Sequence, residues 1–111
     1  DTGHLYYAGI DPVAFIKNNL DRIEHVHFKD VRKEVFRKYN SLSDSFLKTI
    51  LSGIFTVPGD GCIDFSSIIK ILQQNQYNGW IIVEAEQDPD KADPFHYAIS
   101  ARNYLDSIII N

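Results

Sequence analysis

Two stretches of this chain have the pattern of β-strands, and the segment between them has the pattern of helices. Residues 23–28 alternate two sets of side chains at period two and are rich in strand-forming residues. Residues 80–85 are almost continuously apolar, which is typical of a parallel strand buried on both faces. Because strands separated by helices are joined by crossovers, the sequence predicts an α/β fold with a parallel sheet.

Capping residues and apolar stripes predict the helices. The expected helices cover residues 12–20, 31–40, a short segment after 43, 65–72 and a last segment that begins at 94. The last helix should bury an apolar face made of Phe95, Ala98, Ile99, Leu105, Ile108 and Ile109. A cluster of turn residues at 58–61 predicts a tight turn.

The chain is too short for a complete eight-stranded barrel. Only two full strands and one strand end, at Asp1, are expected, whereas a (β/α)8 TIM barrel needs about 250 residues and this chain has 111. The start at Asp1 and the absence of methionine also indicate a piece of a longer polypeptide. We therefore expect residues 1–111 to be the C-terminal portion of one TIM-barrel domain, from about the end of strand six to the final helix. A small self-contained α/β domain is the alternative.

Composition limits the partners and the location that we expect. The 11 Lys and Arg residues against 15 Asp and Glu residues give a net charge of −4, which argues against binding nucleic acid through its phosphates. The apolar runs are too short to span a membrane. A single cysteine, Cys62, allows no internal disulfide and favours the reducing cytoplasm. An exposed sheet edge would also favour a homo-oligomer.

Polar residues gather where the predicted strands end. His27 and Lys29 share one face of the first strand, Glu84 ends the second, and Asp1 and His4 open the chain. The carboxyl ends of barrel strands form the active-site floor, so these side chains should converge there. Asp, His and Glu together suit a divalent ion such as Mn²⁺, Co²⁺, Mg²⁺ or Zn²⁺.

Each of these residues also has a simpler explanation. Asp1 would serve as a helix cap, His27 as a hydrogen-bonded core histidine and Glu84 as a solvated acid at a strand end. Their placement on successive strand ends favours the metal site over three unrelated roles.

Several segments carry a resemblance to a known family. In residues 1–4, 7–11, 26–30, 59–61 and the strand that ends at Glu84, the chain resembles the xylose-isomerase-like TIM barrels. This family includes metal-dependent sugar isomerases, epimerases, dehydratases and apurinic endonucleases. It is more narrowly similar to the inosose dehydratases of myo-inositol catabolism in residues 28–32, 53–61 and 79–89. The resemblance covers essentially the whole chain.

The resemblance implies a set of ligands and a reaction. Asp1, His27 and Glu84 would bind a divalent metal, Mn²⁺ or Co²⁺ before Mg²⁺ or Zn²⁺, and His4 would face the substrate. A hydro-lyase of this family removes water from 2-keto-myo-inositol (scyllo-inosose) and leaves a trihydroxycyclohexane-dione. Glutathione is associated with the same family. A fourth ligand, a Glu from an earlier strand, is not among these residues, so the 111 residues alone should be inactive.

We hypothesise a catalytic or substrate-binding role for each of four residues. His4 and Glu84 would be catalytic, with His4 transferring a proton and Glu84 assisting, and Lys29 or Arg32 would bind substrate and stabilise negative charge on oxygen. Related epimerases have an arginine six residues after the histidine ligand. That position is Lys33 here, and Arg32 is the nearest arginine.

Three other functions are compatible with parts of the pattern. A sugar isomerase or epimerase would use the same enolate chemistry, and an inactive truncated module would only bind. An apurinic endonuclease would need an Asp-x-His pair before the glycine turn, and residues 54–58 contain none.

Overall fold

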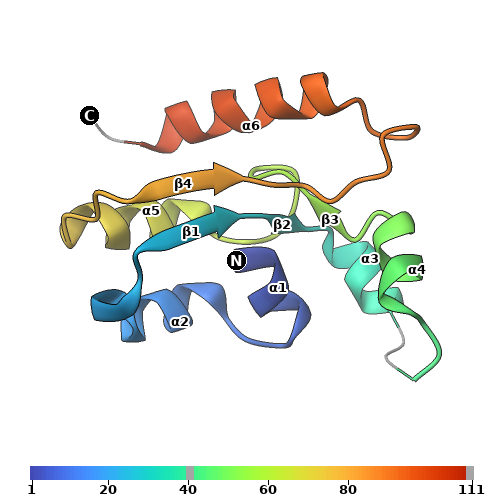
Figure 1. Cartoon of the computed structure of the whole chain (residues 1–111), viewed down its shortest axis with the longest axis horizontal. Coiled ribbons are helices and arrows are strands. Elements are labelled where there is room, and N and C mark those ends of the chain that lie inside the picture. The colour runs from blue at the N-terminus through green and yellow to red at the C-terminus, as the bar shows by residue number, and fades with distance from the viewer. Residues whose placement is uncertain (40–41, 110–111) are drawn as a thin grey trace.

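Helices and strands alternate along most of the chain, as expected. A computed structural model describes residues 1–39 and 42–109. In chain order the elements are α1 (Thr2–Tyr7), α2 (Pro12–Asn18), the 3₁₀ turn η1 (Leu20–Arg22), β1 (His25–Phe28), β2 (Asp30–Val31), α3 (Lys33–Lys38), α4 (Phe46–Leu51), β3 (Phe55–Thr56), α5 (Phe65–Gln74), β4 (Trp80–Val83) and α6 (Pro94–Ile108) (Figure 1).

The two predicted strands lie side by side and run parallel. β1 and β4 pair in a register that places His25 opposite Trp80 and Phe28 opposite Val83. Helix α5 belongs to the connection between them, and its apolar stripe is buried as predicted, with Asp64 accepting a hydrogen bond from the backbone N–H of Ser67 at its N-terminus. The parallel α/β arrangement is therefore confirmed for this strand pair.

A second, antiparallel strand pair was not predicted. β2 and β3 pair Asp30 with Thr56 and Val31 with Phe55. Val31 was expected to begin a helix, but it is fully buried in β2 and helix α3 begins only at Lys33. A two-residue strand leaves no periodic pattern in the sequence, because its pairing depends on a partner 24 or more residues away.

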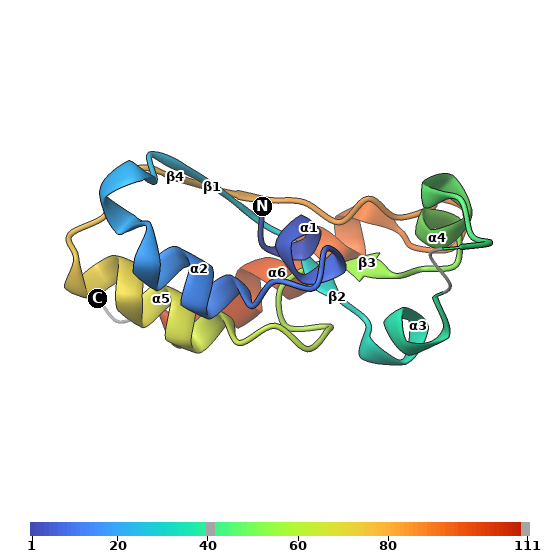
Figure 2. The ribbon, with the colours of Figure 1, turned by 90° about the horizontal axis from the view of Figure 1, so that it is seen from below.

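Helices cover one face of the parallel strand pair. Figure 2 shows β1 and β4 along one side of the molecule, with α2, α5 and α6 on the other side. The buried core fills the space between these layers and continues beneath β2 and β3. It consists of Ile16, Val26, Phe28, Val31, Ile54, Phe55, Ile63, Phe65, Ile68, Ile69, Leu72 and Leu105.

Strand β4 is less buried than its apolar sequence predicts. Trp80 is 75% exposed and Val83 is 38% exposed, so the expectation of burial on both faces is wrong for these residues. Among the described residues β4 pairs only with β1, and helices lie on only one face of the pair. No described helix or strand therefore covers Trp80, whereas Val83 faces α6 across an open cavity.

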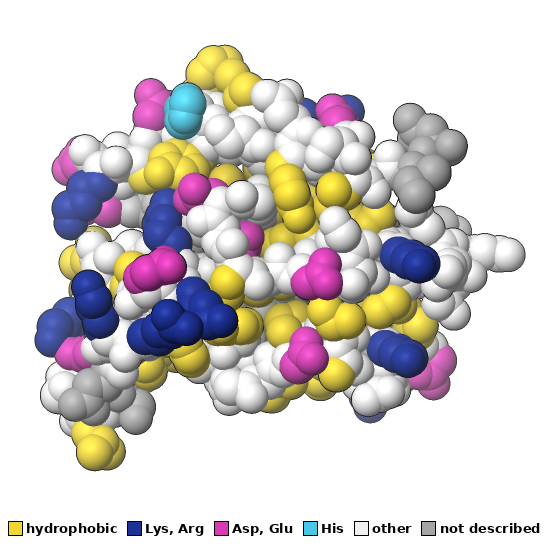
Figure 3. Space-filling view, turned by 180° about the vertical axis from the view of Figure 1, so that it is seen from behind, with side chains coloured by type: hydrophobic (Ala, Val, Ile, Leu, Met, Phe, Trp, Pro, Cys, Tyr) yellow, Lys and Arg dark blue, Asp and Glu magenta, His cyan; other side chains and the backbone are white. Residues whose placement is uncertain are grey.

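The apolar face predicted for α6 is only partly buried. Ala101 and Leu105 are buried in α6, whereas Phe95 and Ile99 are exposed. Between α6 and β4 lies a cavity of about 600 Å³, lined in part by Ile81 and Leu105. Figure 3 shows the molecule from behind, with hydrophobic side chains exposed among polar ones. None of the described helices has the length and apolar character needed to cross a bilayer.

The first residues form a helix rather than the end of a strand. Asp1 is the N-cap of α1, and its side chain accepts a hydrogen bond from the backbone N–H of His4. The hydroxyl of Thr2 donates to the carbonyl of Lys29 at 2.7 Å and accepts from the Lys29 N–H at 3.0 Å. These two bonds hold the start of α1 against the carboxyl end of β1.

Candidate metal centre

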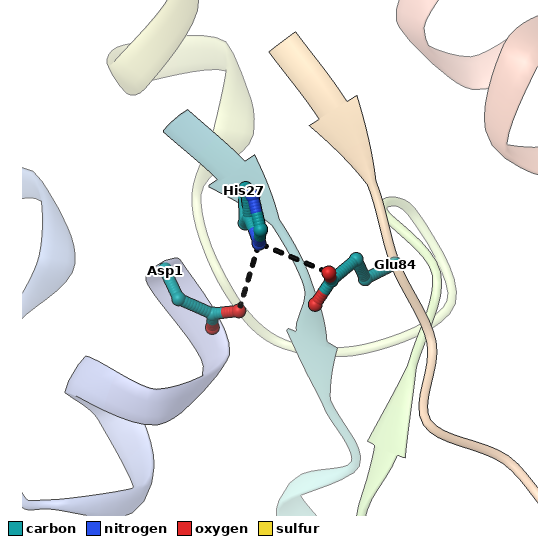
Figure 4. A group of neighbouring side chains, drawn as sticks. All are labelled: Asp1, His27 and Glu84. Atoms are coloured by element: carbon teal, nitrogen blue, oxygen red, sulfur yellow. Dashed lines mark ion pairs between the residues drawn. The ribbon is translucent and has the colours of Figure 1, made fainter. Parts of the chain in front are cut away.

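The structure brings Asp1, His27 and Glu84 together. His27 Nδ1 lies 3.0 Å from Glu84 Oε1 and 4.0 Å from Asp1 Oδ2. One donor atom from each residue lies within 4.8 Å of the other two. Figure 4 shows the three side chains pointing toward one another from the start of α1, from β1 and from the segment after β4.

The register of the parallel strands explains this convergence. The backbone N–H of Glu84 donates to the carbonyl of Phe28 at 3.1 Å, which continues the β1–β4 pairing by one residue. His27 and Glu84 therefore reach the same face at adjacent strand ends, while Val26 and Phe28 point into the core. The Thr2 bonds place Asp1 beside them.

Two carboxylates and an imidazole at this separation fit a divalent ion. Carboxylate oxygen and neutral imidazole nitrogen are common ligands of Mn²⁺, Co²⁺ and Zn²⁺. Asp1 is the helix cap that the simpler explanation proposed, but only one of its oxygens caps the helix. The other oxygen faces His27 and Lys29.

Lys29 lies buried in the centre of the acidic residues. Its side chain is 1% exposed, and Nζ lies 3.2 Å from Asp1 Oδ2, 3.0 Å from Glu84 Oε2 and 2.6 Å from Glu86 Oε2. A buried ammonium needs such partners, because its desolvation is costly. Lys29, which the sequence predicts to bind substrate, therefore lies directly beside the candidate metal ligands Asp1 and Glu84.

The charges around Glu84 favour its ionised form. Burial by itself raises the pKa of the Glu84 carboxyl, but the hydrogen bonds and charges of Lys29 and His27 outweigh burial, so that its pKa is lowered. An ionised carboxylate is the form that binds a metal ion.

His4 lies at the accessible edge of the same group. Its Nε2 is 3.0 Å from Lys29 Nζ and 3.2 Å from Glu86 Oε2, and its side chain is 43% exposed. The ring packs against Phe46 and Phe55, with centroids 5.8 and 5.3 Å away. His4 is thus held in place while a polar edge remains open to a small molecule.

The structure places Arg32 outside this group. Its guanidinium donates to the carbonyl of Gly53, to the hydroxyl of Thr56 and to the carboxylate of Asp60, at 2.9–3.0 Å. These described contacts hold the loop around β3, and none is with Asp1, His27 or Glu84. Lys33, at the start of α3, is exposed.

Glu86 is a member of the group that the sequence analysis did not select. Its carboxylate contacts both Lys29 and His4. The sequence did contain a signal for Glu86: it follows Glu84 by two residues, and in an extended segment two such side chains lie on the same side. The backbone of Glu86 is not extended, however, because its φ is 47°, so only the tertiary structure shows where its side chain lies.

A parallel strand pair with helices on one face and polar residues at its carboxyl ends is an arrangement that α/β barrels contain. The chain belongs to the xylose isomerase-like TIM barrel family, whose model matches residues 1–108.

Curated relatives narrow this assignment. The chain is 51% identical over 110 residues to an inosose dehydratase of Halalkalibacterium halodurans, a match that covers 99% of this chain and 36% of the relative. It is 55% identical over 105 residues to an inosose dehydratase of Clostridium beijerinckii, covering 95% of this chain and 35% of the relative. An inosose dehydratase of Bacillus velezensis is 47% identical over all 111 residues, which is 37% of its length. The chain thus spans about a third of the curated relatives it matches.

Proposed function

We propose that this chain is part of a metal-dependent hydro-lyase that dehydrates 2-keto-myo-inositol to a trihydroxycyclohexane-dione. The observation that carries the proposal is the convergence of Asp1, His27 and Glu84 around the buried ammonium of Lys29. This site occurs in a chain about half identical to relatives named inosose dehydratase.

The reaction breaks two bonds on neighbouring carbon atoms. A base removes the proton from the carbon next to the ketone, and hydroxide leaves from the following carbon with help from an acid. The resulting enol keeps the hydroxyl of the deprotonated carbon and tautomerises to a second ketone. The net change is the loss of one water molecule.

Asp1, His27 and Glu84 would hold the divalent ion. When bound, such an ion supplies Lewis-acid stabilisation of the negative charge that develops on the ketone oxygen. Lys29 adds a fixed positive charge from a side chain that is 1% exposed, and a buried charge acts more strongly than one in solvent.

His4 is the proposed proton-transfer residue. An imidazole can accept and release a proton near neutral pH, and His4 combines a fixed ring with an exposed side chain. Glu84 would assist through its ionised carboxylate. Arg32, whose described bonds hold the β3 loop, remains a predicted substrate residue with less geometric support than Lys29.

We also propose that residues 1–111 form the C-terminal part of a single barrel. In that arrangement β1 and β4 are the seventh and eighth strands, and a Glu from an earlier strand completes the ligand set. The free edge of β4 and the share of the relatives that is matched support a chain that is one part of a larger barrel. Glutathione, a homo-oligomer and a cytoplasmic location remain predictions.

Product analysis of the full encoded protein tests the proposal. Incubation with 2-keto-myo-inositol should give a product lighter by one water in mass spectrometry. Chelation should abolish its formation, and added Mn²⁺ or Co²⁺ should restore it. A product of unchanged mass would instead identify an isomerase or epimerase, and no product with any of these metals would contradict the proposed activity.

A further inference from the structure

Glu86 contacts the metal-site group without belonging to its three proposed ligands. Its Oε2 accepts a hydrogen bond from Lys29 Nζ at 2.6 Å, which is the shortest of the described contacts of that ammonium. The same oxygen lies 3.2 Å from His4 Nε2. Glu86 thus joins the two side chains to which we assign substrate chemistry.

The backbone of Glu86 is held in an unfavourable conformation. Its φ of 47° lies in the left-handed region, which residues with a Cβ rarely adopt. Such conformations persist where the surrounding structure fixes them, and they are concentrated at functional sites. The bend after β4 turns the Glu86 carboxylate toward Lys29 although the regular strand ended at Val83.

Lys29 and a divalent ion would compete for the same oxygens. The Lys29 ammonium is within 3.2 Å of Asp1 and Glu84, both of which are proposed ligands. A buried ammonium that lost its third carboxylate would be drawn more closely to these two. The ammonium would then compete more strongly with a divalent ion for the lone pairs of Asp1 and Glu84.

We propose that Glu86 is a positioning residue that anchors the ammonium of Lys29 through its shortest contact, and that it thereby weakens the competition of this ammonium with a divalent ion for the oxygens of Asp1 and Glu84. This inference rests on the proposed function, because it assumes that these residues are ligands. It assigns to Glu86 an effect on metal affinity that is transmitted through Lys29.

The affinity for Mn²⁺ alone tests this inference in the full encoded protein. Glu86→Gln should raise the Kd, measured by equilibrium dialysis with metal analysis, about 10- to 100-fold, as is typical of residues that orient ligands. Glu24→Gln is the matched control, because Glu24 is an exposed glutamate before β1, and it should leave the Kd unchanged. Circular dichroism should show the same fold in both variants.

A double-mutant cycle shows whether the effect passes through Lys29. In a Lys29→Met background, where no ammonium competes, Glu86→Gln should change the Kd by less than about twofold. An equal loss in both backgrounds would indicate a direct electrostatic effect and overturn the positioning role. If Glu86→Gln does not fold, Glu86→Asp should raise the Kd in the wild-type background but not in the methionine background.

The cycle also separates this inference from the proposed function. A wild-type protein that binds no Mn²⁺ would contradict the metal centre itself. A wild-type protein that binds Mn²⁺ and a Glu86→Gln variant with the same affinity would leave the metal centre intact and overturn the role of Glu86.

Discussion

At the scale of single residues, the side chain of Lys29 organises the centre. It comes from the end of β1, is buried, and contacts residues from α1 and from the segment after β4. The three carboxylates and the imidazole of His4 therefore all contact the Lys29 ammonium, and the position of this ammonium depends on the methylene groups of its side chain. Substitutions that move these methylene groups should disturb the centre without removing any proposed ligand.

Gly3→Ala should displace Lys29. A Cβ at Gly3 would lie 2.7 Å from Lys29 Cγ and 2.9 Å from Cδ, in the middle of a buried side chain. We expect the free energy of unfolding to fall by about 1–3 kcal/mol and the affinity for Mn²⁺ to fall with it. Urea unfolding and equilibrium dialysis on the full encoded protein measure both. Ser66→Ala, on the exposed side of α5, is the control; wild-type Mn²⁺ binding in Gly3→Ala would contradict this packing.

His4→Asn should reduce turnover but leave the metal content unchanged. Asparagine keeps a polar amide but cannot transfer a proton near neutral pH, and general acid or base catalysis contributes about 100-fold or more. Metal analysis and the rate of product formation give the two readouts. His96→Asn, an exposed histidine in α6, should match the wild type. Unchanged turnover in His4→Asn would remove His4 from the mechanism.

At the scale of elements, the sequence predicts the N-terminal caps of the helices but not the short strands β2 and β3. Asp11, Asp64 and Asp93 each accept hydrogen bonds from the first turn of the helix that follows. These bonds join residues two or three positions apart, so local sequence is sufficient to predict them. β2 and β3 pair residues 24 and 26 positions apart, and Asp30 of β2 also accepts a hydrogen bond from the backbone N–H of Gly59.

Asp64→Ala should weaken α5 in a pH-dependent manner. Hydrogen bonds from the hydroxyl and the backbone N–H of Ser67 lower the pKa of Asp64 below its ordinary value of 3.8. Because the pKa is lower in the folded state, the stabilisation is present above pH 3.8 and is lost as the pH falls through the folded pKa. The substitution should cost about 1 kcal/mol at pH 7.

Urea unfolding of the full encoded protein between pH 7 and pH 3 measures this dependence. The difference between wild type and Asp64→Ala should shrink toward the acidic end. Asp64→Asn keeps a capping oxygen without a titrating group and should remain close to the wild type at pH 7. A cost for Asp64→Ala that stays constant across the range would show that the ionised carboxylate is not the stabilising species.

At the scale of the whole molecule, the described residues leave apolar surface open. Trp80 is exposed on β4, which has an unpaired edge and one face that no described helix covers. A cavity separates part of β4 from α6. Unpaired strand edges promote association, and native proteins usually cover or charge them. The proposed barrel would cover this edge with another strand.

The 111 residues expressed alone should therefore self-associate through this edge. Trp80→Lys places a charge at the start of β4 and should shift analytical ultracentrifugation profiles toward the monomer. Phe95→Lys is a matched control, because Phe95 is also 75% exposed but lies on helix α6. An equal effect of both substitutions would point to general hydrophobic association instead of strand pairing.

The sequence by itself determined the elements whose signals are local or periodic: the parallel strands, the capped helices and the apolar stripe of α5. It also selected Asp1, His27 and Glu84, because residues at the carboxyl ends of parallel strands share one edge of the sheet. Only the tertiary structure decided the pairing of β2 with β3, the burial of Lys29 and the inclusion of Glu86. These features depend on contacts between residues 24 to 82 positions apart, and such contacts leave no periodic pattern in the chain.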